Sequence, residues 1–306
     1  MQTQKTYDII IIGGGPAGLS AGIYTARAGQ STLLIEKGAI GGQAINTALV
    51  ENYPGFEGIS GIDLTQAMYR QAKKFGIEET YAEVTGIEIK GALKIVHTSQ
   101  GEFGARCIIV AGGLERQKLG VPGEAEFTGR GVSYCATCDG AFFRNKAVAV
   151  VGGGNAALTE ALELTRFASK VTVIHRRNEL RATKILQDKA FAEPKLEFLW
   201  DSTIEEITGD KAVKKVRVVN VKSQEKTALD VSGIFVAVGF KPNTGYLKGV
   251  VDMDDNGSII TNARMETSVP GIMAAGDIRS GSIRQLIASA GDGAVAAISA
   301  EKYLSG

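Results

Sequence analysis

The sequence has few of the residues that build disulfide scaffolds or metal centres, since its 306 residues include three cysteines and two histidines. A disulfide scaffold would carry more cysteines in a shorter chain, and zinc would need further ligands beside the one Cys-x-x-Cys pair. The remaining candidates, Cys107, His97 and His175, are scattered singly. We therefore expect no metal site. Cys107 opens the apolar run Cys107–Val110 and is expected to be a small buried side chain.

An excess of charge and long apolar runs are also missing. The formal net charge is +1, so no broad basic surface for nucleic acid is expected. No apolar run approaches the roughly 20 residues of a membrane-spanning helix. Met1–Lys5 leads directly into an apolar run, which leaves no room for a secretory signal. These features predict a cytoplasmic protein that binds neither nucleic acid nor membrane.

Glycine, in contrast, is abundant, with 39 residues. Much of the excess lies in short clusters at the ends of apolar runs, which predicts backbone that approaches a ligand closely. The length suggests two domains, and 44% hydrophobic with 22% charged residues is typical of globular proteins. The clusters are Gly13–Gly15, Gly41–Gly42, Gly112–Gly113 and Gly152–Gly154.

The first cluster belongs to a dinucleotide-binding pattern. The β-branched run Tyr7–Ile12 predicts a strand buried on both faces, a helix is expected over Leu19–Ala28, and a strand at Ser31–Ile35 ends at Glu36. The glycines of the intervening Gly-x-Gly-x-x-Gly allow a tight turn, close approach to a pyrophosphate and close helix packing, while the helix N-terminus faces the phosphates. Glu36 can accept hydrogen bonds from an adenosine ribose.

A second unit repeats this pattern, with a strand at Lys146–Val151, a glycine turn from Gly152 and a helix over Leu158–Phe167. Basic residues stand where the first unit has its acid. A ribose 2′-hydroxyl prefers an acid, whereas a 2′-phosphate prefers cations, best of all bidentate arginine. The second unit is therefore expected to bind NADP(H); the alternatives are a solvated basic helix start and a nucleic-acid patch. The basic residues are His175, Arg176, Arg177 and Arg181.

A Cys-x-x-Cys pair lies between the two units, in the stretch Ser133–Gly140. In a cytosolic α/β protein this pair indicates redox or metal chemistry, because two intervening residues hold both sulfurs within bonding distance and can lower the pKa of the nucleophile. Asp139 follows Cys138 directly and can protonate a departing thiolate; the alternative role is a helix cap. A dithiol between two dinucleotide sites suggests an electron path from one to the other through Cys135 and Cys138.

Two breakers, Glu115–Gly123 and Lys241–Asn243, bracket the second unit. We infer that this unit is inserted into the first domain, which the C-terminal segment completes. The predicted fold is α/β, with two Rossmann-like three-layer dinucleotide-binding domains. The expected domains are 1–117 with 244–306, which carries the first dinucleotide turn, and 118–243, which binds NADP(H) and carries the cysteine pair.

In this order, the motifs resemble the low-molecular-weight bacterial-type thioredoxin reductases over essentially the whole chain. The specific marks are Cys135–Gly140, His175–Arg177 and Ala274–Asp277. The resemblance implies a homodimer with FAD and NADPH as cofactors and a thioredoxin-like protein as partner. The residues implied for FAD are Gly13, Gly15, Pro16, Ala17, Gly18, Glu36, Gly42, Gln43, Asn52, Val84, Ala111, Gly112, Asp277, Arg284 and Gln285. Those implied for NADPH are Gly152, Gly154, Asn155, Ala156, His175, Arg176, Arg177 and Arg181.

The resemblance also implies residue roles. Cys138 would lie nearer the flavin, Cys135 would attack the partner disulfide, and Asp139 would donate a proton. Electrons would pass from NADPH to FAD, to the Cys135–Cys138 disulfide and then to the partner by thiol–disulfide exchange. Arg284 and Gln285 would open the last helix. One departure is that the family usually has Ala-Thr-Gly where this chain has Ala-Gly-Gly, from residue 111 to residue 113.

Four alternatives remain. A ferredoxin–NADP reductase of related fold would lack the cysteine pair. A flavin-dependent dithiol oxidase would not need the arginines that follow His175. A ferredoxin-linked reductase would not need the intact second glycine turn. A non-enzymatic redox sensor would need no NADPH turnover. In the favoured interpretation, the cysteine pair and NADPH must take turns at the flavin, which predicts rotation of the inserted domain about Glu115–Gly120 and Lys241–Asn243.

Overall fold

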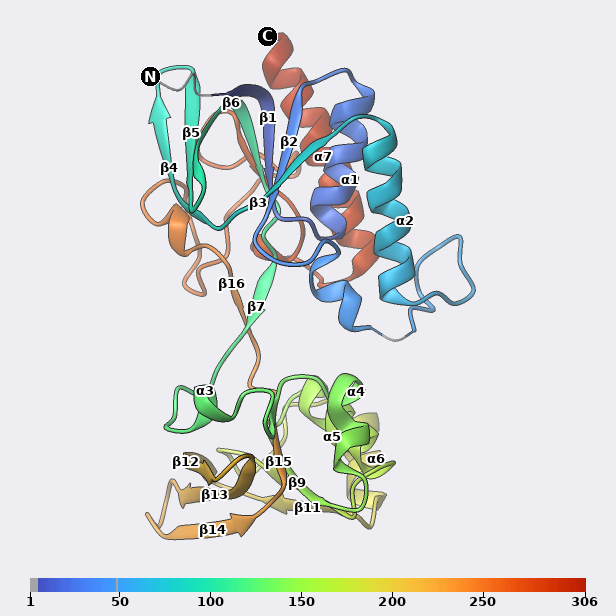
Figure 1. The fold of residues 1–306 in the computed structure, drawn as a ribbon, viewed down its shortest axis with the longest axis vertical. Helices are drawn as coiled ribbons and strands as arrows, with labels where there is room; N and C mark the ends of the chain where they lie inside the picture. Colours follow the sequence, from blue (N-terminus) through green and yellow to red (C-terminus); the bar gives the residue numbers. More distant parts are fainter. Residues whose placement is uncertain (1–4, 48) are drawn as a thin grey trace. The chain divides into compact units, whose positions relative to one another are not determined.

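The computed structural model describes residues 5–47 and 49–306, and the expectation about the N-terminal segment concerns residues outside this part. The chain forms two compact units (Figure 1). Unit 1 comprises the chain up to Glu115 together with Lys241–Gly306, and unit 2 comprises Arg116–Phe240. The two connecting segments, β7 (Leu114–Arg116) and β16 (Phe240–Pro242), pair with each other.

Unit 1 is built on a seven-stranded sheet in the described residues, in the order β3-β2-β1-β6-β5-β4 with β17 beside β6. The strands β1, β2, β3, β6 and β17 run parallel, and β4 and β5 form an antiparallel hairpin against β6. The elements are β1 (Thr6–Ile12), α1 (Pro16–Arg27), β2 (Thr32–Glu36), η1 (Gly42–Asn46), α2 (Gly61–Lys74), β3 (Glu78–Tyr81), β4 (Val84–Lys90), β5 (Leu93–Thr98), β6 (Gly101–Val110), η3 (Gly245–Leu247), β17 (Ile272–Ala274), η4 (Gly276–Ile278) and α7 (Leu286–Ser305).

The helices α1, α2 and α7 cover one face of this sheet (Figure 1). Ile9 and Ile11 of β1 face these helices, whereas Ile10 and Ile12 face the opposite cluster, so β1 is buried on both sides as its sequence predicts. The helices α1 and α7 approach closely, because a Cβ atom added at Gly293 would lie 2.0 Å from the carbonyl oxygen of Ala17.

Unit 2 has a five-stranded parallel sheet in the described residues, in the order β11-β10-β9-β15-β8, and a separate antiparallel sheet β12-β13-β14. One face of the parallel sheet packs on α5 and the other on the antiparallel sheet, which gives three layers. The elements are α3 (Glu124–Phe127), β8 (Val132–Ser133), α4 (Ala136–Asp139), η2 (Gly140–Phe143), β9 (Ala147–Val151), α5 (Asn155–Thr165), β10 (Lys170–Ile174), α6 (Lys184–Ala192), β11 (Leu196–Leu199), β12 (Ser202–Gly209), β13 (Val213–Asn220), β14 (Lys226–Asp230) and β15 (Gly233–Val236).

One predicted helix start is wrong. The last helix begins at Leu286 and not at Arg284, because Arg284 has a φ of +56°, outside the right-handed helical region, and Gln285 is the N-cap residue with a φ of −122°. The helix thus begins two positions later than expected, and Arg284 lies before it.

Gly18 packs so closely against the first glycine turn that replacing it tests the role of that turn in stability. A Cβ atom at Gly18 would lie 1.8 Å from the carbonyl oxygen of Gly13, whereas one at Gly22, on the same helix, would make ordinary contacts at 3.6 Å with Ile77. Gly18→Ala is expected to destabilise the protein by more than about 3 kcal/mol, because backbone must move. Gly22→Ala is expected to be neutral or to stabilise by about 0.5–1 kcal/mol. Urea unfolding of both variants measures this, and equal midpoints would contradict it.

Candidate active site

The first glycine turn follows β1 and is held by the acid at the end of β2. Gly13 has a φ of +108°, and a Cβ there would lie 2.4 Å from the carbonyl oxygen of Ala111. The Glu36 carboxylate accepts hydrogen bonds from the backbone amides of Gly14 at 2.7 Å and Gly38 at 2.8 Å. These two bonds leave further lone pairs on the carboxylate for a ligand hydroxyl.

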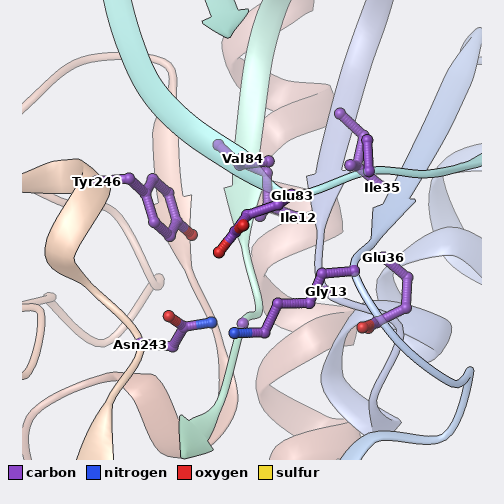
Figure 2. A pocket seen from close by; sticks show the side chains of 11 residues that line it. Ile12, Gly13, Ile35, Glu36, Glu83, Val84, Asn243 and Tyr246 are labelled. Atoms are coloured by element: carbon purple, nitrogen blue, oxygen red, sulfur yellow. The ribbon is translucent and has the colours of Figure 1, made fainter. Parts of the chain in front are cut away.

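A cavity of about 60 Å³ opens beside this turn (Figure 2). It brings together four residues expected at a dinucleotide from the sequence: Gly13, Glu36, Val84 and Gly112. Sequence reasoning missed the remaining lining residues, of which three adjoin Gly13 or Glu36 and the others come from distant segments that no local pattern could have found. The three neighbours are Ile12, Ile35 and Lys37, and the distant residues are Ala82, Glu83, Asn243 and Tyr246.

Other residues predicted to bind FAD gather around the same end of unit 1. Gly42 lies against Gly15, because a Cβ on Gly42 would be 3.1 Å from the Gly15 Cα atom. The side chain of Asn52 donates a hydrogen bond to Gln285 at 3.0 Å, across 233 positions of sequence. Such a contact cannot be deduced from either local pattern.

The acid after β17 is also held in place. Asp277 accepts hydrogen bonds from the hydroxyl groups of Ser282 at 3.0 Å and Ser289 at 3.1 Å. Helix α1 begins at Pro16, with Gly15 as its N-cap residue, so the amides of Ala17 and Gly18 belong to the first turn. First-turn amides have no partner within the helix and can face an anion. Gln43 lies on η1, where Asn46 donates a hydrogen bond to it at 3.5 Å.

The second glycine turn has the same construction. Gly152 has a φ of +146°, and a Cβ there would lie 2.4 Å from the carbonyl oxygen of Ala237. Gly154 is the N-cap of α5 and has open space where a side chain would be. Asn155 and Ala156 start that helix and are exposed. The turn therefore presents bare backbone and a helix N-terminus, as a pyrophosphate requires.

Two backbone contacts bring the basic segment to this turn. The amide of Arg181 donates to the carbonyl oxygen of Gly153 at 2.7 Å, and the amide of Thr183 donates to the side chain of Asn155 at 2.7 Å. Arg176, Arg177 and Arg181 are exposed, and among the residues that the structure describes none of their guanidinium groups forms an ion pair. These cations are available to a ligand.

His175 lies elsewhere than the sequence suggested. Its side chain is buried, 4% exposed, and packs under Gly153, where an added Cβ would lie 2.3 Å from the imidazole ring. Burial lowers the pKa of His175, so the ring is neutral at pH 7. The histidine therefore supports the turn from below, and the exposed positive charge comes from the three arginines.

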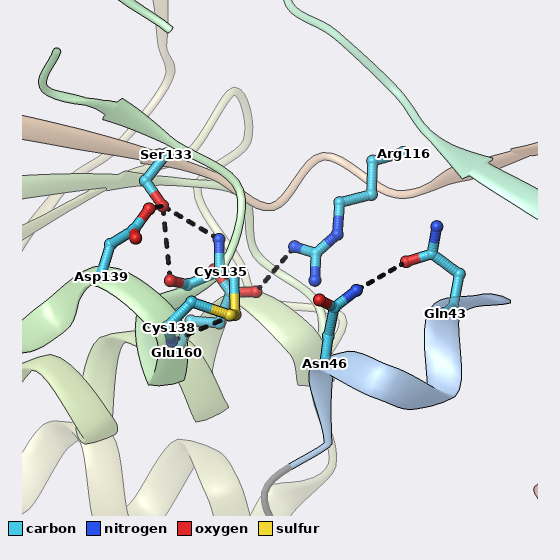
Figure 3. Close-up of a disulfide and its surroundings, with 8 residues drawn as sticks. All are labelled: Gln43, Asn46, Arg116, Ser133, Cys135, Cys138, Asp139 and Glu160. Carbon is cyan, nitrogen blue, oxygen red and sulfur yellow. Dashed lines mark hydrogen bonds and ion pairs between the residues drawn. A yellow bond between two sulfur atoms is a disulfide. The ribbon is translucent and has the colours of Figure 1, made fainter. Parts of the chain in front are cut away.

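Cys135 and Cys138 form a disulfide at the start of the short helix α4 (Figure 3). Cys135 is the N-cap residue, and its Sγ accepts a hydrogen bond from the Cys138 amide at 3.2 Å. Cys138 is exposed and Cys135 is half-buried. A backbone amide aimed at a sulfur favours the thiolate at that position.

Asp139 is bonded to a serine that sequence reasoning missed. Ser133, which is 4% exposed, donates from its hydroxyl group to Asp139 at 2.6 Å and accepts from the Cys135 amide at 3.1 Å. The alternative that Asp139 caps a helix is wrong: it is the last residue of α4, and as N-cap of η2 its side chain makes no capping bond. Ser133 links the carboxylate to the cysteine backbone.

Glu160 of unit 2 lies on α5 and is drawn beside the disulfide in Figure 3. Glu160 Oε1 accepts from Arg116 at 3.3 Å, and its Oε2 is buried without a hydrogen-bond partner in the described residues. Burial raises the pKa of Glu160 from its ordinary value of 4.5 to about 7, against the lowering effect of the Arg116 charge. Nothing in the local sequence distinguishes this glutamate from its neighbours on the helix.

This raised pKa predicts a pH-dependent stability. Between pH 4.5 and about 7 the folded state holds a proton that the unfolded state has lost, so the stabilising effect of the neutral carboxyl disappears as the pH rises through about 7. Glu160→Gln removes this dependence. Relative to wild type, its free energy of unfolding is expected to increase by up to about 3 kcal/mol between pH 4.5 and pH 8. Urea unfolding at both pH values measures the difference.

The matched control is Glu163→Gln, on the same helix, where the carboxylate pairs with Arg166 at 2.9 Å and is more exposed. Its stability difference from wild type is expected to be nearly independent of pH. A Glu160→Gln variant that follows the wild-type profile across this pH range would contradict the assignment of a raised pKa.

The remaining cysteine, Cys107, lies in the core of unit 1. Cys107 is fully buried, and burial raises the pKa of its thiol to about 12, as expected for a small core side chain. The described part of the chain contains no group of three or more His, Cys, Asp or Glu residues placed to hold a metal ion. None of its helices is long and apolar enough to cross a membrane.

Comparison with known proteins defines the class. The pyridine nucleotide-disulphide oxidoreductase family matches residues 7–293, and the chain belongs to this family. Membership implies a flavin and a nicotinamide cofactor. Among similar proteins, the thioredoxin reductase of Listeria monocytogenes is 48% identical over 302 residues, covering 98% of this chain and 95% of the relative. That of Bacillus subtilis is 48% identical over 305 residues, with 99% and 96% covered.

The solved structure of Lactococcus lactis thioredoxin reductase superposes with a TM-score of 0.88 and 48% identity, covering 98% of this chain and 99% of that one. The resemblance drawn from the motifs is therefore confirmed, as is the α/β fold with two Rossmann-like domains.

Proposed function

We propose that this protein is an NADPH-dependent, FAD-containing thioredoxin-disulfide reductase. The observation that carries the proposal is that one unit holds both the Cys135–Cys138 disulfide and a second dinucleotide turn flanked by unpaired arginines. A dithiol oxidase or a ferredoxin-linked enzyme has no use for such a cationic cluster. Relatives that are 48% identical over nearly the full chain carry the name thioredoxin reductase.

FAD fits unit 1. The bare glycine turn, the first-turn amides of α1, the Glu36 carboxylate and the adjacent cavity supply contacts for a pyrophosphate and an adenosine. Asp277, Asn52 and Gln285 lie at the same end of the unit and would hold the rest of the molecule. When bound, the flavin accepts a hydride and returns two electrons to a disulfide.

NADPH fits unit 2. The Gly152 turn and the N-terminus of α5 would hold the pyrophosphate, and the 2′-phosphate would lie among Arg176, Arg177 and Arg181. His175 keeps the turn in shape from beneath and stays neutral.

The reduced cysteines then reduce the partner by exchange. The Cys135 thiolate, favoured by the Cys138 amide, attacks one sulfur of the partner disulfide and expels the other as a thiolate. Cys138 next attacks Cys135 in the mixed disulfide, which re-forms the Cys135–Cys138 bond and releases the second partner sulfur. Two electrons and two protons have then moved to the partner. Asp139, positioned by Ser133, is placed to move the proton at the cysteine pair.

The cysteine pair and the NADPH site are both on unit 2, and each must reach the flavin in turn. We therefore expect unit 2 to change orientation between reduction of the flavin and reduction of the disulfide. Glycines with positive φ precede each connecting strand: Gly113 at +59° and Gly239 at +117°. We further propose a cytoplasmic homodimer, on the strength of the family resemblance.

Anaerobic mixing tests the function. The purified yellow protein should bleach with NADPH, and the flavin colour should return when an oxidised thioredoxin is added in excess. NADH should bleach it far more slowly. If NADPH leaves the flavin oxidised while reduced ferredoxin bleaches it, the proposal fails and a ferredoxin-linked reductase takes its place.

A further inference from the structure

Tyr246 presents a buried hydroxyl group to the cavity beside the first glycine turn. It lies on η3, and its ring lines the cavity together with Glu83 and Asn243 (Figure 2). The Tyr246 Oη atom is buried and has no hydrogen-bond partner in the described residues. A buried hydroxyl without a partner costs free energy, so a native structure normally supplies one or leaves it for a ligand.

The space in front of this hydroxyl exists because residue 112 is glycine. A Cβ at Gly112 would lie 3.6 Å from Tyr246 Oη, 3.5 Å from Ile278 Cδ1 and 3.8 Å from the carbonyl oxygen of Asn243. These are ordinary contact distances, and the backbone of Gly112 is not left-handed, so a Cβ atom would fit. A threonine here could place its own hydroxyl beside the phenol and satisfy it.

The neighbours of the cavity indicate what the hydroxyl meets. Gly13 and Glu36, which belong to the dinucleotide pattern, line the same cavity, as does Val84. An adenosine offers ring nitrogens and ribose oxygens as acceptors. Burial raises the pKa of Tyr246, so the phenol remains a donor at neutral pH. The lining also offers nitrogen donors on Lys37 and Asn243 beside its two carboxylates, Glu36 and Glu83.

We propose that Tyr246 is a cofactor-binding residue whose hydroxyl group donates a hydrogen bond to the adenosine half of the dinucleotide, in the space that Gly112 leaves open. This inference rests on the proposed FAD site in unit 1. It adds a contact from a segment outside the glycine pattern, supplied by residues Asn243–Tyr246 after the second connecting strand.

The test is FAD affinity, measured by calorimetry on flavin-free protein prepared from the holoenzyme. Tyr246→Phe is expected to weaken FAD and AMP binding by about 5- to 20-fold each, the scale of one lost hydrogen bond. The melting temperature of the flavin-free variant should equal or exceed that of wild type, because an unsatisfied hydroxyl has been removed. A purely structural role for the hydroxyl would lower that temperature instead. Tyr24→Phe, at an exposed tyrosine of α1, is the control and should change neither value.

Gly112→Thr provides a second variant. Its hydroxyl should engage Tyr246 and weaken AMP binding by a similar factor while the fold persists. Wild-type protein that binds no FAD would overturn the proposed function itself. Wild-type protein that binds FAD, with a Tyr246→Phe variant of unchanged affinity for both FAD and AMP, would overturn only the role of Tyr246.

Discussion

Replacing Cys138 with serine is expected to lower thioredoxin reduction by at least about 10³-fold while leaving reduction of the flavin by NADPH intact. The loss is this large because a residue that forms and breaks a covalent bond in each cycle has no substitute. Cys135 in this variant can still attack the partner disulfide, but nothing resolves the mixed disulfide. A covalent complex with the partner should therefore accumulate and be visible by electrophoresis without reductant.

The cysteine pair allows a paired experiment. Cys135→Ser should abolish turnover equally, yet trap less partner, because the sulfur that receives the Cys138 amide bond has been removed. Cys107→Ala is the control, since its buried thiol is remote from exchange chemistry and its loss should affect stability more than turnover. Turnover in the Cys138→Ser variant within tenfold of wild type would show that the disulfide is not on the electron path.

The sequence predicted the central parallel strands of both units, because strands buried on both faces are largely apolar, as in Tyr7–Ile12 and Lys146–Val151. It missed β3, β14 and α6, which have exposed or mixed faces and so lack a clear period. It also missed β12, whose pairing with β13 has irregular register. Tertiary pairing, and not local preference, defines these elements.

The residues of the candidate site likewise divide into those that the sequence predicted and those that it did not. The glycine turns and the cysteine pair are local patterns in which spacing alone implies geometry, and the structure brings Gly13, Glu36 and Gly112 together as such patterns require. The positions of His175 and Ser133 could not be predicted. A histidine after a strand can point to solvent or beneath the turn, and only the missing side chain of Gly153 makes room for the ring.

Glu160 of α5 and Tyr246 of η3 are two further residues whose properties the sequence could not predict. Glu160 acquires its raised pKa from burial beside Arg116, which belongs to a strand more than forty positions away in the chain. Tyr246 acquires its role from the absence of a side chain at residue 112. Each depends on the space that distant segments leave, and no spacing rule encodes that space.

Replacing Arg176 and Arg177 together by alanine is expected to raise the KM for NADPH by about 10²-fold and to leave the KM for NADH within about twofold. Charge-assisted hydrogen bonds from arginine to phosphate contribute about 1.5–3 kcal/mol each. Exposure of both side chains to solvent reduces that contribution, so the lower end of the combined range is expected. Steady-state kinetics with both nucleotides at low salt measure the ratio of the two KM values.

Salt dependence and a matched arginine variant test whether the weaker NADPH binding comes from the lost charges of Arg176 and Arg177. Raising the ionic strength should weaken NADPH binding in the wild type and have less effect in the double variant, because screening acts on charges that the variant has lost. Arg166→Ala removes an exposed arginine that pairs with Glu163 at the end of α5, and should leave both KM values unchanged. Equal losses for NADPH and NADH in the double variant would mean that the arginines hold the turn in shape and do not bind the 2′-phosphate. In that event Arg181, whose amide is bonded to the Gly153 carbonyl, would be the remaining cation of the cluster able to select NADPH.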